Sequence, residues 1–373
     1  MISPITYTFE ELVAHKENGL APEDVLEKLR VDADEILTKP TLKVTDIQLP
    51  RPSGNIHDYV SVSPYRWPNP DTPDGLPWVR RDGYVNKETR TGIHPGVVYG
   101  RIHTLALAAF YFGDNGYSEY ANRQMYDWFI NPDTYIEPHG MYAQAIPGVS
   151  DGAVAGLIEF CTCTNLHNGV GVLDCMGLLD EKILAGVQAW FVKFTDWLLT
   201  SERGVAEGNG YDNHGAWYDA QVLSAAVFCQ RPSVVKSICQ KSYNRRIKTL
   251  IKPDGSQPAE LKRATPMHYS IYALSAMMIF ANIADRLGYS EYWGIDGERG
   301  YCILKSAVDF IYPLIKNPEA SPYPDIKPGL AGPGCARILT ALAKRYPNEG
   351  YEERAMEFSA STAEKMWRLE PTI

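Results

Sequence analysis

An adjacent Asn and His stand where an apolar helical run begins, at Asn213 and His214 in the segment from Gly210 to Asp219. At the start of a helix, both side chains can project into a cleft. His can act as a base near neutral pH, and the Asn amide can donate a hydrogen bond to an oxyanion or a carboxylate. The plainer alternative, in which Asn213 caps the helix and His214 packs, is the commoner outcome for an isolated pair.

A second candidate group lies further along the chain, where Arg263 and Tyr269 are six residues apart. Tyr269 and Tyr272 open the next predicted helix. A positive charge beside a phenol favours the phenolate form, so an Arg near a Tyr would make that Tyr a better proton-transfer group. Taken alone, the segment also fits a Tyr on a core face and an Arg in a surface ion pair.

Together these four residues describe one reaction, the β-elimination of a 4-linked uronic acid. The C6 carboxylate must be neutralised so that the C5 proton becomes acidic, a base must remove that proton, and an acid must protonate the departing O4. Asn213 and Arg263 suit the first task, His214 or Tyr269 the second, and Tyr269 the third. The reaction requires neither a metal nor a cofactor. No Asp/Glu pair is singled out by its spacing for glycoside hydrolysis, although such a pair could form in space.

A cluster of cations could bind the acidic sugar. Residues 51–95 contain no periodic helix, yet they are rich in Pro, Gly, Tyr and Trp, which predicts an ordered arm rather than disorder. Guanidinium groups bind carboxylates bidentately, and aromatic faces stack on pyranose rings. The alternative is a solvated loop with ordinary surface charges. The cations of the arm and of the helix after it are Arg66, Arg80, Arg81, Lys87, Arg90 and Arg101.

Composition sets the broad class. The chain has 373 residues, 45% of them hydrophobic, and a formal net charge of −9, which argues against a nucleic-acid partner. We see no apolar run long enough to cross a bilayer and no signal peptide. The seven Cys show no paired metal-site spacing, so most are expected to be small buried hydrophobic side chains. If the protein is secreted, one or two disulfides are the alternative.

Apolar residues recur at steps of three and four along most of the chain, which predicts helices separated by short breaks. Clear strand alternation is scarce, and no repeat of fixed period is present. We therefore expect an all-α fold, an α/α toroid of about six to seven αα-hairpins in one domain spanning 1–373, with 51–95 as an arm over the cleft. The predicted helices lie at 8–17, 22–38, 98–112, 117–130, 153–164, 183–197, 214–230, 232–251, 271–281, 304–314, 332–346 and 350–367.

Four ordered motifs resemble the alginate-lyase superfamily, and most closely polysaccharide lyase family 38. The resemblance spans residues 63–270. It implies an α/α toroid and a metal-independent lyase that leaves 4,5-unsaturated uronate ends on alginate, especially polymannuronate, or on β-1,4-glucuronan. The motifs are SPYRWPNPDTPDGLPWVRRDGYVN (63–86), YAQAIPG (142–148), DNHGAWYDAQ (212–221) and DGSQPAELKRATPMHYS (254–270).

The resemblance also implies a role for each candidate residue. Asn213 would help neutralise the substrate carboxylate, and Arg263 would bind charge near it. His214 would hold or deprotonate the sugar, and Tyr269 would act as base, acid or both. The residues expected to bind substrate are Arg66, Trp67, Tyr65, Gln144, Trp217 and His268.

The chain departs from the family pattern in three places. Asp212 precedes the Asn-His pair where the family has a further Asn, and Arg66 stands where the family has the first Trp of a Trp pair. Gly152-Ala153 replaces a Gly-Arg pair, and this absent Arg bears on substrate preference. An anionic polysaccharide is thus the expected partner, with no nucleic acid or membrane, for a secreted and monomeric enzyme. The alternatives are a glycoside hydrolase on an α/α barrel and a non-catalytic polyuronate-binding protein.

Overall fold

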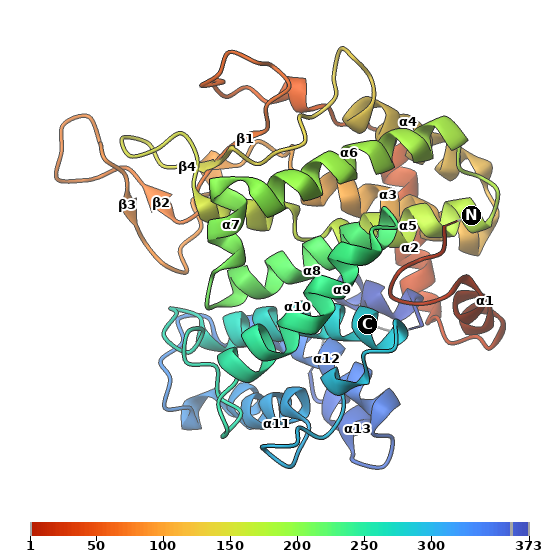
Figure 1. Ribbon diagram of the computed structural model, residues 1–373, viewed down its shortest axis with the longest axis vertical. Coiled ribbons are helices and arrows are strands. Elements are labelled where there is room, and N and C mark those ends of the chain that lie inside the picture. The colour runs from red at the N-terminus through yellow and green to blue at the C-terminus, as the bar shows by residue number, and fades with distance from the viewer. Residues whose placement is uncertain (1, 359–360, 372–373) are drawn as a thin grey trace. The chain divides into compact units, whose positions relative to one another are not determined.

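A computed structural model describes residues 2–358 and 361–371 (Figure 1). This part of the chain is mostly helical, and its few strands are short, as the predicted all-α class requires. The α-helices are α1 (Phe9–Glu17), α2 (Glu23–Leu37), α3 (Pro95–Phe112), α4 (Asn115–Phe129), α5 (Cys163–Cys175), α6 (Glu181–Thr200), α7 (Glu202–Gly208), α8 (Asn213–Phe228), α9 (Pro232–Ser242), α10 (Pro266–Arg286), α11 (Ile303–Lys316), α12 (Gly332–Arg345) and α13 (Tyr351–Met356). The strands are β1 (Val60–Val62), β2 (Arg66–Trp67), β3 (Val79–Arg80) and β4 (Tyr142–Ala145).

The strongest apolar patterns form helices where they were predicted, in α3, α6, α10 and α11. Helix α3 shows how its ends are set. The His94 side chain accepts a hydrogen bond from the Gly96 amide, Pro95 occupies the first turn, and Gly113 closes the helix in the left-handed conformation with φ 71°. Val98, Ile102 and Leu105 are fully buried, so the three-and-four spacing marks the core face of this helix.

Three of the predicted helices are wrong in extent. The helix predicted at 153–164 is a 3₁₀ segment, Val154–Phe160, and α5 follows it where no helix was predicted. The helix predicted at 232–251 ends at Ser242 and continues as a π-helix, Tyr243–Lys248. The helix predicted at 350–367 is the short α13 and a 3₁₀ segment, Thr362–Leu369, and residues 359–360 lie outside the described part. Helix α7 was also missed.

Helix α5 escaped prediction because glycine is a poor helix former and two glycines stand in its middle. Both are required by close packing. A Cβ on Gly169 would lie 3.0 Å from the His103 Cα atom of α3, and a Cβ on Gly171 would lie 2.3 Å from the Pro4 nitrogen. Tertiary approach therefore outweighs local propensity in this helix.

The chain divides into two compact units. Unit 1 comprises Met1–Ile5, Arg30–Asn209 and Ser224–Arg231, and unit 2 comprises Thr6–Leu29, Gly210–Leu223 and Pro232–Ile373. In unit 1, α3 packs against α4 and α5, and α6 packs against α4 and α7. In unit 2, α10 packs against α11 and α12, and α12 against α13. The single domain expected from the sequence stays a prediction.

Helix α10 forms the centre of unit 2. By length and composition it could span a membrane, so the expectation that no apolar run is long enough was wrong. However, 72% of its most apolar 18-residue window is buried inside the protein, which is typical of a core helix. Its first turn carries Tyr269 (6% exposed), so the core helix of this unit also positions a predicted catalytic residue.

The arm at 51–95 is ordered, as predicted. Strands β2 and β3 pair antiparallel, with Arg66 opposite Arg80 and Trp67 opposite Val79 (Figure 1). Strand β1 pairs in parallel with β4, which lies outside the arm. Within unit 1, the arm is thus tied to the segment that carries Gln144.

The seven cysteines are free thiols in the described part of the chain. Five of them are buried: Cys161, Cys163, Cys239, Cys302 and Cys335. This agrees with the expectation that most serve as small hydrophobic side chains.

Candidate active site

Helix α8 begins at the Asn-His pair. The Asp212 carboxylate accepts a hydrogen bond from the His214 amide at 3.0 Å, and the Asp212 carbonyl accepts one from Ala216 at 3.3 Å. Asp212 therefore fills the capping position that Asn213 would take in the plainer alternative. The Asn213 side chain does not cap the helix and can form other hydrogen bonds, although it is only 1% exposed.

Glu260 is the partner of Asn213. One Glu260 oxygen accepts the Asn213 backbone N–H at 2.6 Å, and the other accepts the side-chain Nδ2 at 2.8 Å. Glu260 is 2% exposed, and this burial raises its pKa to about 7, against the lowering effect of the two Asn213 hydrogen bonds. Among the described residues, the Asn213 Oδ1 atom has no hydrogen-bond partner. Glu260 stands within one of the four motifs, but its residue type and position predicted no role for it.

Arg263 and Tyr269 are in contact, as their spacing suggested. The Arg263 amide donates to the Glu260 carbonyl at 3.0 Å, so both residues belong to one turn. The Arg263 guanidinium carbon lies 3.5 Å from the centroid of the Tyr269 ring. Asn213, Glu260, Arg263 and Tyr269 thus form a continuous chain of contacts within unit 2.

Aromatic residues pack beside this group. Trp217, one helical turn after Asn213, lies 4.9 Å from the Tyr272 ring. His268 stacks on Tyr272 at 6.1 Å and meets Tyr269 edge-on at 5.4 Å. Burial lowers the pKa of His268. Trp217 is only 6% exposed, so its apolar body forms a wall rather than an open stacking platform.

Three further candidates lie on the arm, in unit 1. Arg66 donates to the Trp78 carbonyl at 3.3 Å, and the Trp67 indole donates to the Tyr84 carbonyl at 3.0 Å. The carbonyl of Tyr65 accepts from the amide of Arg81 at 2.9 Å. The hairpin therefore fixes the backbone of all three candidates.

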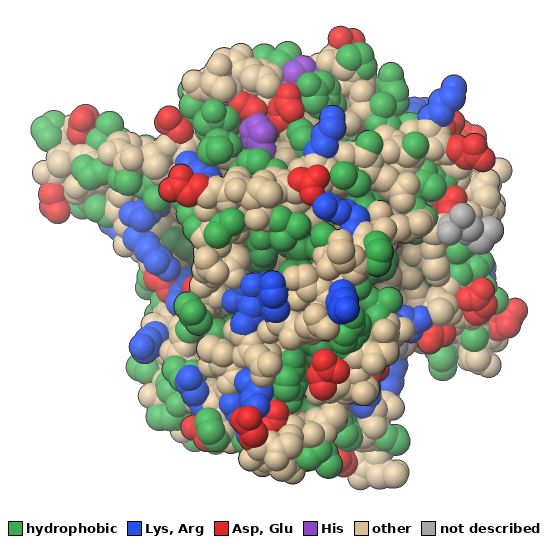
Figure 2. Space-filling model, viewed as in Figure 1, with side chains coloured by type: hydrophobic (Ala, Val, Ile, Leu, Met, Phe, Trp, Pro, Cys, Tyr) green, Lys and Arg blue, Asp and Glu red, His purple; other side chains and the backbone are tan. Residues whose placement is uncertain are grey.

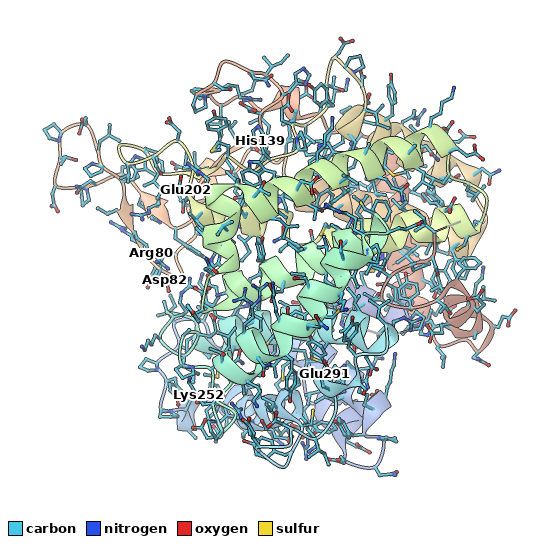
Figure 3. The ribbon with its side chains drawn as sticks, viewed as in Figure 1. Arg80, Asp82, His139, Glu202, Lys252 and Glu291 are labelled. Atoms are coloured by element: carbon cyan, nitrogen blue, oxygen red, sulfur yellow. The ribbon has the colours of Figure 1, made fainter. Side chains whose placement is uncertain are left out.

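The basic cluster of the arm is partly neutralised. Arg80 and Asp82, labelled in Figure 3, form an ion pair at 2.8 Å. Elsewhere on the face drawn in Figure 2, acidic and basic side chains are interspersed rather than collected by sign.

Gln144 has a strained backbone, with φ at 55° in a residue that is not glycine. The backbone N–H of Gln144 donates to the Ser61 hydroxyl at 2.8 Å, and that hydroxyl donates to the Glu159 carboxyl at 2.7 Å. Burial raises the pKa of Glu159 to about 7. Such strain persists only where the surroundings hold it, and the role of Gln144 in binding substrate stays a prediction.

Arg203, in unit 1, is a cation that the sequence did not predict as part of the site. Where the family has a Gly-Arg pair, a Cβ on Gly152 would lie 2.8 Å from Nη1 of Arg203 on α7. That nitrogen is buried and has no hydrogen-bond partner among the described residues. Arg203 therefore places a guanidinium nitrogen beside Gly152, the residue before the position of the absent Arg.

A buried ionic network supports the start of α8. Asp219, fully buried, accepts from Arg246 Nε at 2.9 Å, Arg245 Nε at 3.0 Å and Ser242 Oγ at 2.7 Å. Arg246 also donates to the Gly210 carbonyl at 2.6 Å. The π-helix, which carries both arginines, is thereby tied to the segment that leads into Asn213.

Replacing Gly215 with Ala is expected to lower the free energy of unfolding by about 1–3 kcal/mol through overpacking. The new Cβ would lie 2.2 Å from the Gly210 carbonyl and 2.5 Å from Arg246 Nη1, so backbone must move. Gly100→Ala in α3 is the control, because a Cβ there meets nothing within 4 Å. Denaturant unfolding should show a loss for the first variant and none for the second, and equal behaviour would contradict the packing constraint.

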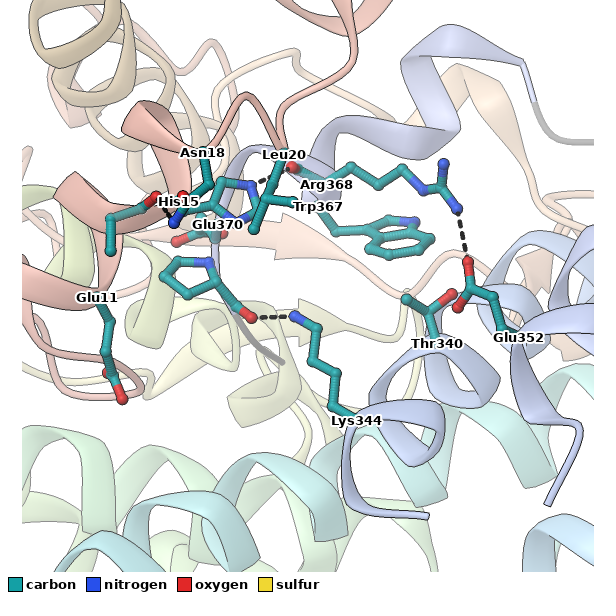
Figure 4. A pocket seen from close by; sticks show the side chains of 12 residues that line it. Glu11, His15, Asn18, Leu20, Thr340, Lys344, Glu352, Trp367, Arg368 and Glu370 are labelled. Atoms are coloured by element: carbon teal, nitrogen blue, oxygen red, sulfur yellow. Dashed lines mark hydrogen bonds and ion pairs between the residues drawn. The ribbon is translucent and has the colours of Figure 1, made fainter. Parts of the chain in front are cut away.

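Two cavities in the described part of the chain are lined by residues other than the candidate site residues. One of about 510 Å³ in unit 2 lies between α1 and the C-terminal segment (Figure 4). There His15 Nε2 lies 2.9 Å from the Arg368 carbonyl, and Arg368 pairs with Glu352 at 3.5 Å. The other, of about 800 Å³ in unit 1, is lined by residues of α2, α4 and α6. Among the described residues, no group of three or more His, Cys, Asp or Glu is placed to hold a metal ion.

Comparisons with known proteins identify the family of the chain. The chain matches the family model described as alginate lyase over residues 43–321. A crystal structure of an alginate lyase from Bacteroides ovatus is 30% identical, with a TM-score of 0.92 over 100% of both chains. No curated protein matches the chain significantly.

More distant structures share the fold alone. Alginate lyase A1-III from Sphingomonas species A1 is 14% identical, with a TM-score of 0.55 over 89% of this chain and 94% of that one. A variant of the A1-III enzyme in complex with a tetrasaccharide gives a TM-score of 0.54 at 14% identity over the same shares of the two chains. The matches agree with the predicted all-α toroid class. The chain belongs to the alginate lyase family and is a polysaccharide lyase.

Proposed function

We propose that the protein cleaves a 4-linked polyuronate, either alginate, especially polymannuronate, or β-1,4-glucuronan, by β-elimination. One observation carries the proposal: a chain of contacts joins Asn213 to Glu260, and Arg263 to Tyr269, within unit 2. The Bacteroides ovatus relative, named as an alginate lyase, supports the substrate class. Because the substrate is an extracellular polymer, we also propose that the enzyme acts outside the cell.

Each residue has a defined part in the elimination. Asn213 donates a hydrogen bond to the C6 carboxylate, and Arg263 supplies positive charge beside it, so that the C5 proton becomes acidic. A base removes this proton, the electron pair forms the C4=C5 double bond, and the C4–O4 bond breaks. The leaving O4 takes a proton from an acid. The Arg263 guanidinium lies 3.5 Å from the centroid of the Tyr269 ring, so a positive charge stands beside the phenol that transfers the proton.

The stereochemistry of the sugar decides which residue is the base. In mannuronate and glucuronate, H5 and O4 lie on the same side of the ring, so Tyr269 alone can remove one proton and supply the other. In guluronate the two lie on opposite sides, and His214 becomes the base with Tyr269 as the acid. A single active site could therefore favour one polymer strongly.

A panel of pure polymannuronate, polyguluronate and glucuronan tests the proposal. We expect absorbance from the new C4=C5 bond to rise with polymannuronate or glucuronan, and more slowly with polyguluronate. Reducing ends formed without this chromophore would indicate hydrolysis instead. Binding without either product would indicate a non-catalytic polyuronate-binding protein, and both results would contradict the proposal.

A further inference from the structure

A buried carboxyl group is an unexpected neighbour for an amide that must bind a substrate carboxylate. Glu260 is 2% exposed, and both of its oxygens accept N–H groups of Asn213, at 2.6 and 2.8 Å. An ionised carboxylate can only accept hydrogen bonds, so this double contact fits the charged form. It directs Nδ2 toward Glu260 with one N–H and leaves the second N–H for another acceptor.

Protonation of Glu260 would break this arrangement. A protonated carboxyl has one O–H donor, which cannot be placed against an N–H of Asn213. The acceptor within the same side chain is Oδ1, which has no hydrogen-bond partner among the described residues. Turning the amide over would bring Oδ1 to the Glu260 O–H and would move Nδ2 to the place that Oδ1 now occupies. The proton taken up by Glu260 comes from solvent, and no other bond changes.

We propose that Glu260 is a positioning residue that holds the Asn213 amide in the orientation that binds the substrate carboxylate, and that it does so only as a carboxylate. The inference rests on the proposed function for its catalytic consequence, although the amide orientation exists without substrate. Glu260 touches Asn213 rather than the sugar, so it acts through that residue. Its protonation state thereby switches one of the groups that acidify the C5 proton.

The switch operates near neutral pH. Burial raises the pKa of Glu260 to about 7, as does the neighbouring Asp212, whereas the Asn213 hydrogen bonds and Arg263 act in the opposite direction. Above this pKa, Glu260 is charged and Asn213 is held correctly. As the pH falls through it, the amide turns and activity is lost. The wild-type enzyme should therefore need one group of pKa near 7 in its deprotonated form.

Two variants separate this role from a merely structural one. Glu260→Gln cannot ionise, and its amide can donate to Oδ1, which fixes the turned orientation. We expect kcat/KM at pH 8 to fall about 10²-fold, which is the usual effect of removing one hydrogen-bond donor to an oxyanion. The acidic limb of the kcat/KM pH profile, near pH 7 in the wild type, should disappear. Glu260→Asp keeps a carboxylate, so it should recover part of the activity and retain an acidic limb. Glu159→Gln removes the other buried carboxyl with a pKa of about 7, and it should keep the acidic limb of the kcat/KM profile.

Selective 15N labelling of asparagine gives a readout that needs no substrate. The Asn213 side-chain signal, assigned by its absence in Asn213→Ala, should shift with a midpoint near pH 7 in the wild type and stay constant in Glu260→Gln. An unchanged acidic limb in Glu260→Gln, or a wild-type signal that does not titrate, would overturn the inference. If no polyuronate is eliminated while the signal titrates as expected, the proposed function fails and the Glu260 switch stands.

Discussion

Replacing Tyr269 with Phe is expected to reduce kcat by about 10⁴-fold, the upper end for one acid–base group, because the phenol serves both proton transfers on a mannuronate or glucuronate unit. The change removes one oxygen and little else. Tyr269 is 6% exposed on the first turn of α10, and the Arg263 guanidinium lies over its ring at 3.5 Å. A Phe ring keeps both the packing and the cation–π contact.

Substrate affinity and stability should therefore stay close to the wild-type values. Initial rates from the C4=C5 absorbance give kcat, calorimetry with the polymer gives affinity, and thermal unfolding checks the fold. Tyr272→Phe is the matched control, because it removes the other phenol of the same helix, whose ring lies 6.5 Å from that of Tyr269. If Tyr269→Phe kept its turnover while Tyr272→Phe lost it, the assignment of the proton-transfer residue would be wrong.

Much of the helical fold could be predicted from local pattern. Helices α3, α6, α10 and α11 each bury one apolar face, and this periodicity is visible in the sequence. Helix α5 was not predicted, because its helical state depends on the close approach of other segments to Gly169 and Gly171. Packing partners distant in sequence carry no local signal, so propensity alone pointed away from a helix there.

The candidate site likewise contains residues that the sequence predicted and residues that only tertiary contacts reveal. Asn213, His214, Arg263 and Tyr269 were identified because their types fit one reaction and their motifs resemble a family. Glu260 was overlooked because a Glu in a polar turn reads as an ordinary surface charge. Its importance comes from a contact across 47 residues, which only folding brings about. Arg203 was missed for the same reason, since its proximity to Gly152 is tertiary.

Asp219 was also overlooked, and its removal should have the largest effect on stability. Asp219→Ala is expected to lower the free energy of unfolding by about 3–5 kcal/mol, because it leaves the buried Arg246 charge without its counter-ion. Arg246 is 2% exposed, and both Asp219 oxygens accept its guanidinium, at 2.9 and 3.2 Å. Arg245 and Ser242 lose their acceptor in the same variant. Chemical denaturation measures the loss.

Asp285→Ala provides the control. It removes an aspartate from an Asp–Arg ion pair that is exposed to solvent. Asp285 contacts Arg345 at 2.6 Å with both side chains about one-third exposed, so its loss should cost about 1 kcal/mol or less.

The two variants should also differ in turnover. Arg246 anchors the Gly210 carbonyl ahead of Asn213, so Asp219→Ala should lose turnover even where it remains folded, whereas Asp285→Ala should not. Equal stability losses would mean that the buried network contributes no more than a surface pair. An unchanged kcat in Asp219→Ala would mean that the start of α8 is held by its own packing.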